Sequence, residues 1–450
     1  MSGHVDILNN FEIRGWAVKD DEKIGDTVSI SLDGEEVARV AARVYRRDLE
    51  EAIGIGKCAF GFTFDETPGV FKPVTIAVRS ASGELLGNGE QVLPPVLSDA
   101  HLRHAYGDRL CSASPMLATP VHDGIAIQGR VLATVGSELG VLPLNSDQPA
   151  VKDLKVTRIS STDFITTSVV SFTLARDYHP GAKIGAVRVC DLRGARKGAW
   201  GRRIEDFTGS MCVPRSLDWL SIPPDENFIR TSGKITAAEF AIGGVAAAHR
   251  IALIARLLLG KEIRRVLDWG VGCGRVAVPL KRAFLEGAEV FGIDVDQVNV
   301  EWCKKNLSDV TVEMGDFYPP LAIESGSVDL IYGISVMTHL SRDAQASWLR
   351  ELRRILRPNG VCILTTHGEY ALSLSEWCPT TLYRDIWRVG ISDALFDDNL
   401  GPSLAIPGYY RGTYQLRRQV EEEWSRYLKI VGYLPAGSHT HQDMVVMMKN

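Results

Sequence analysis

The stretch VLDWGVGCGRVAVPL, residues 266–280, places three glycines at every second position, shortly after an aspartate and a run of apolar residues. The apolar run is typical of a buried strand, and the residues after the glycines are typical of a helix. Glycines between a strand and a helix permit a tight turn and let backbone N–H groups approach a ligand, while the helix N-terminus adds partial positive charge. The stretch therefore predicts a ligand-binding loop.

An acidic residue is expected at the end of the next strand, where it would bind ribose hydroxyls. Asp294, in FGIDVD, lies 20 residues after Gly274 and meets this expectation. The spacing GxGxG differs from the GxGxxG of nicotinamide-binding loops, and a further acidic residue, Asp316 in VEMGDF, ends the third strand. The alternative interpretation is a plain tight turn, which the link between the glycines and the two acidic residues disfavours.

The sequence pattern divides the chain into three parts. Residues 1–97 alternate polar and apolar positions between Gly, Pro and Asp turns, which predicts an all-β, sandwich-like module. Residues 98–225 contain further strand-like stretches and are expected to form a second β-rich domain. From residue 226 to 450, short apolar runs alternate with amphipathic helices, which predicts a parallel sheet covered by helices. Thr236 and Glu239 have capping-box spacing and should begin the first of these helices.

Length and composition limit the class of protein. The chain has 450 residues, which is too long for one core, and its 45% hydrophobic and 23% charged residues are ordinary for a globular protein. The net charge of −5 provides no basic field, so nucleic acid is not expected as a partner. Eight cysteines without a C-x-x-C pair favour a reducing compartment, and we predict a cytoplasmic protein. No apolar run reaches the roughly 20 residues of a membrane span.

Four motifs, LDWGVGCGR, GIDV, MGDF and LRPNGVCILTTH, resemble in their order those of class I S-adenosylmethionine-dependent methyltransferases. The resemblance covers residues 226–450 and implies a Rossmann-like α/β domain with a seven-stranded sheet whose last strand is antiparallel. EEWSRYLKIVGYLP and HQDMVVMMKN would form the final two strands. The implied cofactor is S-adenosylmethionine, and no metal site is predicted.

The resemblance also implies roles for individual residues. Asp268 would orient the methionine amino group of the cofactor. Asp294 would accept both ribose hydroxyls, with Val295 against the adenine, and Asp316 would accept the adenine amino group, with Phe317 beside it. The loop glycines would line the methionine and ribose portion: Gly270, Gly272 and Gly274.

Methyl transfer requires a cofactor and an acceptor held in line, and a hydroxyl acceptor also benefits from a base with a pKa near neutrality. YGIS, which contains Gly333, follows the fourth strand and would face the sulfonium. His339 and His367 follow the fourth and fifth strands, where such sheets bind their ligands. We predict His367 as the catalytic base, with His339 as the second candidate. For each, a hydrogen-bonded structural histidine is the alternative.

Two further segments bear on the acceptor. FIRTSGK, residues 228–234, is expected to cover the methionine end, and residues 368–416 are expected over the acceptor pocket. The second segment is rich in aromatic residues, which suit sugar rings or planar acceptors but could also form a small core: Trp377, Tyr383, Trp387, Phe396, Tyr409, Tyr410 and Tyr414. His439 and His441 in GSHTHQD could bind a metal, contact substrate or be solvated.

YYRGTYQ and QDMVVM resemble methyltransferases of bacterial surface polysaccharide biosynthesis, and the N-terminal region resembles β modules found beside such enzymes. These resemblances favour O-methylation of a sugar or glycan. Two alternatives stay open. One is a small-metabolite methyltransferase whose β domains support homo-oligomerisation. The other is a non-catalytic protein that binds the cofactor or a glycan, although the intact Asp268, glycine loop, Asp294 and Asp316 argue against a degenerate cofactor site.

Overall fold

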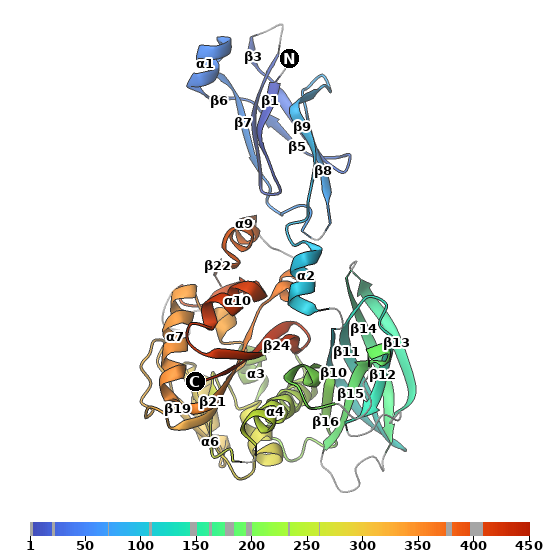
Figure 1. Ribbon diagram of the computed structural model, residues 1–450, viewed down its shortest axis with the longest axis vertical. Coiled ribbons are helices and arrows are strands. Elements are labelled where there is room, and N and C mark those ends of the chain that lie inside the picture. Colours follow the sequence, from blue (N-terminus) through green and yellow to red (C-terminus); the bar gives the residue numbers. More distant parts are fainter. Residues whose placement is uncertain are drawn as a thin grey trace. The chain divides into compact units, whose positions relative to one another are not determined.

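The computed structural model is drawn in Figure 1. The structure describes residues 3–19, 23–70, 72–107, 110–144, 151–161, 164–175, 184–194, 200–232, 235–260, 262–374, 380–396 and 408–450. The chain forms two compact units: Met1–Leu102 with Ser375–Ser392, and Arg103–Leu374 with Asp393–Asn450. The β-rich N-terminal region and the α/β C-terminal region are confirmed, while the domain limits at residues 97 and 225 stay predictions.

The first unit is built from one hydrogen-bonded path of strands, β5-β4-β8-β9-β1-β2-β7-β6, with β3 paired to β2. Because apolar side chains from both halves of this path share one core, the sheet folds over on itself. The core includes Val5, Ile13, Phe60, Val28, Ile76 and Val78. The strands are β1 (Gly3–Leu8), β2 (Glu12–Lys19), β3 (Ile24–Gly25), β4 (Thr27–Leu32), β5 (Glu35–Ala41), β6 (Val44–Tyr45), β7 (Lys57–Thr63), β8 (Val74–Arg79) and β9 (Leu85–Leu93).

Two helices complete the first unit, α1 (Arg47–Ile53) and α9 (Thr380–Val389). In α9, the Thr380 hydroxyl donates to the Phe64 carbonyl, and the ring of Trp387 packs on Phe11 with centroids 5.9 Å apart. This stretch of the aromatic segment 368–416 therefore packs within the β module. Trp377, named from the sequence, lies outside the described residues.

The second unit begins in α2 (Asp99–Tyr106) and continues into two antiparallel sheets, β10-β11-β14-β13 and β12-β15-β16. Their core contains Ile127, Val170 and Met211 together with Ile242 from helix α4 (Ala237–Leu259), so the β-rich region and α4 are one packed body. The strands are β10 (Cys111–Val121), β11 (Gly124–Thr134), β12 (Leu139–Pro143), β13 (Val151–Ser161), β14 (Ile165–Ala175), β15 (Ile184–Asp191) and β16 (Ser210–Pro214).

The α/β part of this unit is a seven-stranded sheet in the order β19-β18-β17-β20-β21-β25-β24. The first five strands are parallel, and β25 is antiparallel to both of its neighbours. Successive residues of β17, Val266 and Leu267, enter two different cores, as expected for a sheet covered on both faces. The strands are β17 (Arg265–Trp269), β18 (Glu289–Asp294), β19 (Thr311–Met314), β20 (Val328–Gly333), β21 (Leu356–Thr366), β24 (Lys429–Ser438) and β25 (Gln442–Met448).

Helices cover this sheet, and a short β pair adjoins it. Thr236 and Glu239 form the predicted capping box of α4, since the Glu239 N–H donates to Thr236 Oγ1 at 3.2 Å and the Thr236 N–H to Glu239 Oε2 at 2.7 Å. The other elements are α3 (Asp225–Ser232), α5 (Ala277–Pro279), a π-helix (Leu280–Phe284), α6 (Gln297–Asn306), α7 (Arg342–Ile355), α8 (Glu369–Ser373), α10 (Arg417–Trp424), β22 (Ile391–Phe396) and β23 (Arg411–Gln415).

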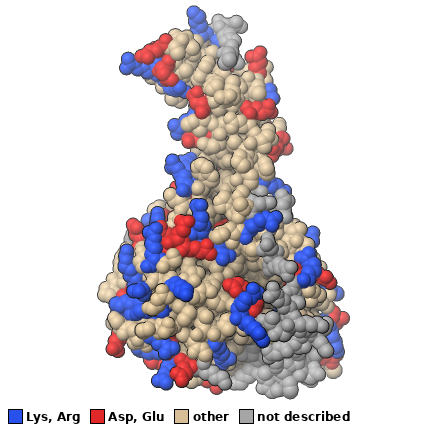
Figure 2. Space-filling model, viewed as in Figure 1, with Lys and Arg blue, Asp and Glu red and all other residues tan. Residues whose placement is uncertain are grey.

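Helix α4 has 23 residues and is long and apolar enough to cross a membrane by length and composition, yet 72% of its most apolar window is buried inside the protein. Burial of this kind is typical of the core helix of a folded domain. On the face seen in Figure 2, basic and acidic side chains are interspersed. Among the residues that the structure describes, no group of three His, Cys, Asp or Glu could hold a metal ion.

Candidate active site

The glycine loop follows β17 and borders a cavity at the carboxyl ends of the parallel strands. Gly270, Gly272 and Gly274 have φ angles of 80°, 53° and 78°, which residues with a side chain rarely adopt. A Cβ at Gly270 would also collide with Val336, and one at Gly272 would lie 2.5 Å from Thr231 Cγ2. Both backbone conformation and space therefore require glycine, which leaves the loop's backbone open to a ligand.

Asp294 ends β18 and faces this loop. Its Oδ2 accepts the Gly272 N–H at 2.6 Å, and its Oδ1 accepts the Asp296 N–H at 2.9 Å. Burial raises the pKa of Asp294, although these backbone hydrogen bonds act in the opposite direction. Ligand hydroxyls that donate to this carboxylate would compensate its burial, as a ribose does.

Asp268 lies at the start of the loop and is buried. The hydroxyl of Tyr332, which is its partner on the neighbouring strand β20, donates to Oδ2 at 2.8 Å. Burial raises the pKa of Asp268 to about 8, against the opposing effect of the Tyr332 hydrogen bond. A cationic group in the cavity would favour the ionised carboxylate.

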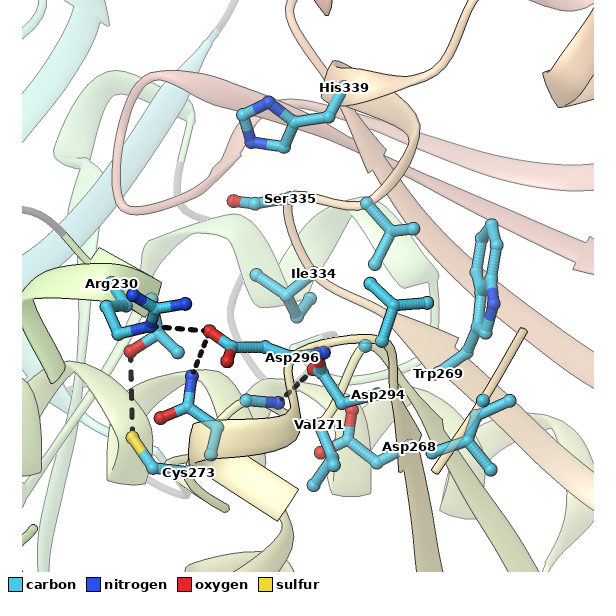
Figure 3. Close-up of a pocket in the computed structure, with 18 of the residues that line it drawn as sticks. Arg230, Asp268, Trp269, Val271, Cys273, Asp294, Asp296, Ile334, Ser335 and His339 are labelled. Carbon is cyan, nitrogen blue, oxygen red and sulfur yellow. Dashed lines mark hydrogen bonds and ion pairs between the residues drawn. The ribbon is translucent and has the colours of Figure 1, made fainter. Parts of the chain in front are cut away.

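Helix α3 contributes Arg230 and Thr231 to one side of the cavity, while the prediction that FIRTSGK covers the methionine end stays a prediction. Arg230 Nε lies 2.7 Å from Asp296 Oδ2, and this ion pair lies in the wall of the cavity beside Thr231. Figure 3 shows Arg230 and Asp296 joined there. Asp296 also accepts from Asn299 Nδ2 at 3.2 Å, so its carboxylate is held in place from two elements.

Tyr409 and Tyr410 close another side of the cavity. The Tyr409 hydroxyl donates to the Phe317 carbonyl, and the two rings are 5.0 Å apart. Tyr410 packs edge-on against His339 with ring centroids 5.8 Å apart. In Figure 3, His339 and Ser335 lie at one end of the pocket, and Asp294 and Asp268 lie toward the other.

The predicted residues thus separate into two groups. Seven line the cavity: Asp268, Gly270, Gly272, Asp294, Val295, Asp316 and His339. Four are not among its lining residues: Gly274, Phe317, Gly333 and His367. His367 instead stacks on Tyr414 with ring centroids 5.0 Å apart, and its Nε2 lies 3.4 Å from Nε2 of Gln442.

Several cavity residues had no role assigned from the sequence. Arg275 directly follows the last loop glycine and Asp296 lies two residues beyond Asp294, so both could have been found as polar neighbours of motif residues. The part played by Gln442 could not. Its amide contacts the Ser335 hydroxyl at 2.7 Å although the two residues are 107 positions apart, and only the pairing of β25 with β21 brings them together.

Residues 266–360 match the family model of a methyltransferase domain. The PH0226 protein of Pyrococcus horikoshii OT3 is a similar solved structure, with 21% identity over 46% of this chain and 92% of that one and a TM-score of 0.32. The 1,6-didemethyltoxoflavin-N1-methyltransferase of Burkholderia thailandensis, solved with S-adenosylhomocysteine, has 15% identity over 46% and 79% of the two chains and a TM-score of 0.31. Residues 266–360 are thus a methyltransferase domain, as the motifs predicted, and the cofactor of such a domain is S-adenosylmethionine.

The cavity residues fit this cofactor by their chemistry. The buried carboxyl group of Asp268 and the half-buried one of Asp294 suit an ammonium group and hydroxyl groups, and the bare glycine loop allows close approach of the ligand. Asp316 also lines the cavity, with Gly315 beside it. The individual contacts assigned to these residues stay predictions.

Proposed function

We propose that the protein transfers the methyl group of S-adenosylmethionine to a hydroxyl group of a sugar or glycan in surface polysaccharide biosynthesis. The observation that carries this proposal is the polar end of the cavity, where Ser335 and His339 lie away from the acidic residues and Tyr410 packs on His339. Hydroxyl and imidazole groups beside an aromatic ring suit a sugar hydroxyl better than an apolar acceptor.

When bound, the cofactor supplies an electrophilic methyl group on its sulfonium. The chain has to hold the acceptor oxygen in line and take its proton. We assign the proton to His339 because it borders the cavity, whereas His367 does not. This reverses the order that the sequence favoured.

We assign His367 a positioning role through Gln442. The Gln442 amide contacts both the Ser335 hydroxyl, at 2.7 Å, and His367 Nε2, at 3.4 Å. Ser335 has a φ of 61°, and its N–H donates to Thr365 Oγ1 at 2.8 Å. A serine kept in this conformation by its neighbours can orient the acceptor hydroxyl beside His339.

A small planar metabolite is the second candidate acceptor. It is favoured by the apolar wall of the same cavity, which consists of Trp269, Val336, Leu340 and Trp348. The two candidates differ in where the methyl group arrives, on a sugar oxygen or on a heterocycle.

A transfer assay separates them. The full chain is incubated with radiolabelled S-adenosylmethionine and two acceptor panels, nucleotide sugars with surface oligosaccharides and hydroxylated aromatic metabolites, and products are analysed by mass spectrometry. We expect label on a sugar oxygen with the wild type, and about 100-fold slower labelling with His339→Ala. Label only on aromatic metabolites or on nitrogen would contradict the sugar assignment.

A further inference from the structure

Arg275 is a cation in the cavity wall that the protein leaves largely unsaturated. It directly follows the glycine loop, and its Nη1 donates to Nε2 of His439 at 2.8 Å. No ion pair involves Arg275 in the part of the chain that the structure describes, and burial lowers its pKa. A guanidinium has five N–H donors, so most of them stay available to a ligand in the cavity.

The hydrogen-bond partner of Arg275 among the described residues is a neutral histidine. An arginine can only donate, so Nε2 of His439 must be the acceptor, and the proton on Nδ1 then faces the Ser438 hydroxyl at 3.0 Å. Burial and the charge of Arg275 both lower the pKa of His439. His439 therefore orients the guanidinium without neutralising its charge.

The turn that carries His439 is strained. His439 and Thr440 have φ angles of 53° and 59°, between strands β24 and β25, where Asn and Gly are the preferred residues. A β-branched residue with positive φ is unusual, and such conformations persist where the surrounding structure fixes them. Asparagine or glycine would relieve the backbone strain at position 439, but neither has the imidazole ring that contacts Arg275.

Helix α4 makes room for this arrangement. A Cβ at Gly244 would collide with the Arg275 carbonyl, and one at Gly243 would lie 3.3 Å from His439 Nε2 and 3.4 Å from Arg275 Nη1. Three elements, the glycine loop, α4 and the β24–β25 turn, therefore converge on one guanidinium. Asp268 contributes a carboxyl group to the same cavity. The charge of Arg275 acts on this carboxyl group, but the two form no ion pair among the described residues.

We propose that Arg275, oriented by His439, binds the α-carboxylate of the methionine portion of S-adenosylmethionine. The cavity holds a carboxyl group and a guanidinium that do not pair with each other, and an amino acid carries an ammonium and a carboxylate on one carbon. The two pairs are complementary, and guanidinium–carboxylate contacts are among the strong charge-assisted hydrogen bonds. The inference depends on the cofactor alone and is independent of the acceptor.

The test compares S-adenosylmethionine with decarboxylated S-adenosylmethionine, which lacks only the carboxylate, by calorimetric titration of the full chain. Arg275→Met should weaken binding of S-adenosylmethionine by roughly 10- to 100-fold and change the affinity of the decarboxylated compound less than about threefold. Arg282→Met is the matched control, because Arg282 is paired with Asp309 and does not line the cavity. It should leave both affinities unchanged.

His439→Asn is the second variant, in case Arg275→Met does not fold. Asparagine tolerates the left-handed turn but withdraws the ring from Arg275, so a smaller selective loss of about threefold to tenfold is expected. Equal loss for both compounds, or no loss for S-adenosylmethionine, would overturn the role of Arg275. Failure of the wild type to bind S-adenosylmethionine would instead overturn the cofactor assignment.

Discussion

Two arginines of the second unit, Arg250 in α4 and Arg275 after the glycine loop, are both taken out of bulk water, but the protein surrounds them differently. Arg250 donates to five backbone carbonyls from three parts of the chain: Ala113, Phe207, Thr208, Ser210 and Gly437. Arg275 donates to one neutral histidine and borders a cavity. The number of protein acceptors, rather than burial, separates an arginine that holds the fold together from one that can bind a ligand.

The largest expected effect is the loss of stability when Arg250, with its five carbonyl acceptors, is replaced. Arg250→Met removes one donor from each of five buried carbonyls. The Phe207 carbonyl keeps the Ser210 hydroxyl and N–H as donors, and each carbonyl left unsatisfied costs about 1–3 kcal/mol. We expect the free energy of unfolding to fall by about 3–5 kcal/mol, measured by urea denaturation followed by circular dichroism. Arg275→Met removes no comparable set of bonds and should change it by less than about 1 kcal/mol. Similar losses in both variants would refute the comparison.

The two ends of the cavity should respond differently to mutation. His339→Ala should lower turnover by about 100-fold with cofactor affinity nearly unchanged, because a positioned base acts in the transition state. His367→Ala acts through Gln442 rather than on the reacting atoms, and it should raise KM for the acceptor more than it lowers kcat. Steady-state kinetics with an acceptor from the transfer assay measures both. Full turnover of His339→Ala would return His367 to first place.

At the cofactor end, Asp294→Ala should weaken S-adenosylmethionine binding by roughly 10- to 150-fold, since it removes a hydrogen-bond acceptor that is charged when the ligand is bound. Calorimetric titration measures the affinity, and circular dichroism checks the fold. Asp294→Asn retains one acceptor oxygen and should lose less. Unchanged affinity in Asp294→Ala would exclude this carboxylate from the ribose site.

The contrast between these two ends also marks how far the sequence could predict the site. Asp268, Asp294 and the glycine loop are local to strand ends, so their spacing along the chain was enough to bring them to one cavity. His367 also follows a strand end, but β25 pairs beside β21 and Gln442 lies between His367 and Ser335. That pairing depends on residues far apart in sequence, which local patterns do not encode.

The same limit applies to Arg250 and to α9. Arg250 had no role assigned from the sequence, because its five acceptors come from segments that meet only in the folded unit. The aromatic segment 368–416 divides in a way that no composition predicts. Tyr409 and Tyr410 line the cavity, while Trp387 packs on Phe11 of the β module.

Burial of Asp268 should make the free energy of unfolding depend on pH, which tests the protonation state of this carboxyl group. Its pKa rises from 3.8 to about 8 in the folded protein. The folded state therefore binds this proton more tightly than the unfolded chain, so the free energy of unfolding of the ligand-free protein falls as pH rises through this range. Asp268→Asn has no such proton and should show a shallower fall in urea unfolding across the same pH values. Identical slopes would exclude a buried, protonated Asp268.

The smallest expected effect compares the strain assigned to the three-residue turn His439–His441 with that of a two-residue hairpin turn. Asp33 and Gly34 connect β4 to β5 with φ angles of 47° and 92°, as the Asp-Gly signal predicts, and a Cβ at Gly34 would meet no heavy atom within 4 Å. Gly34→Thr therefore adds a β-branched residue at positive φ without a steric clash, and we expect it to lower the free energy of unfolding by about 1 kcal/mol. Gly34→Asn should be nearly neutral, because asparagine tolerates this conformation. If Gly34→Thr left the melting temperature unchanged, a threonine at positive φ would not strain a hairpin turn. The conclusion that the turn carrying His439 is strained would then be wrong.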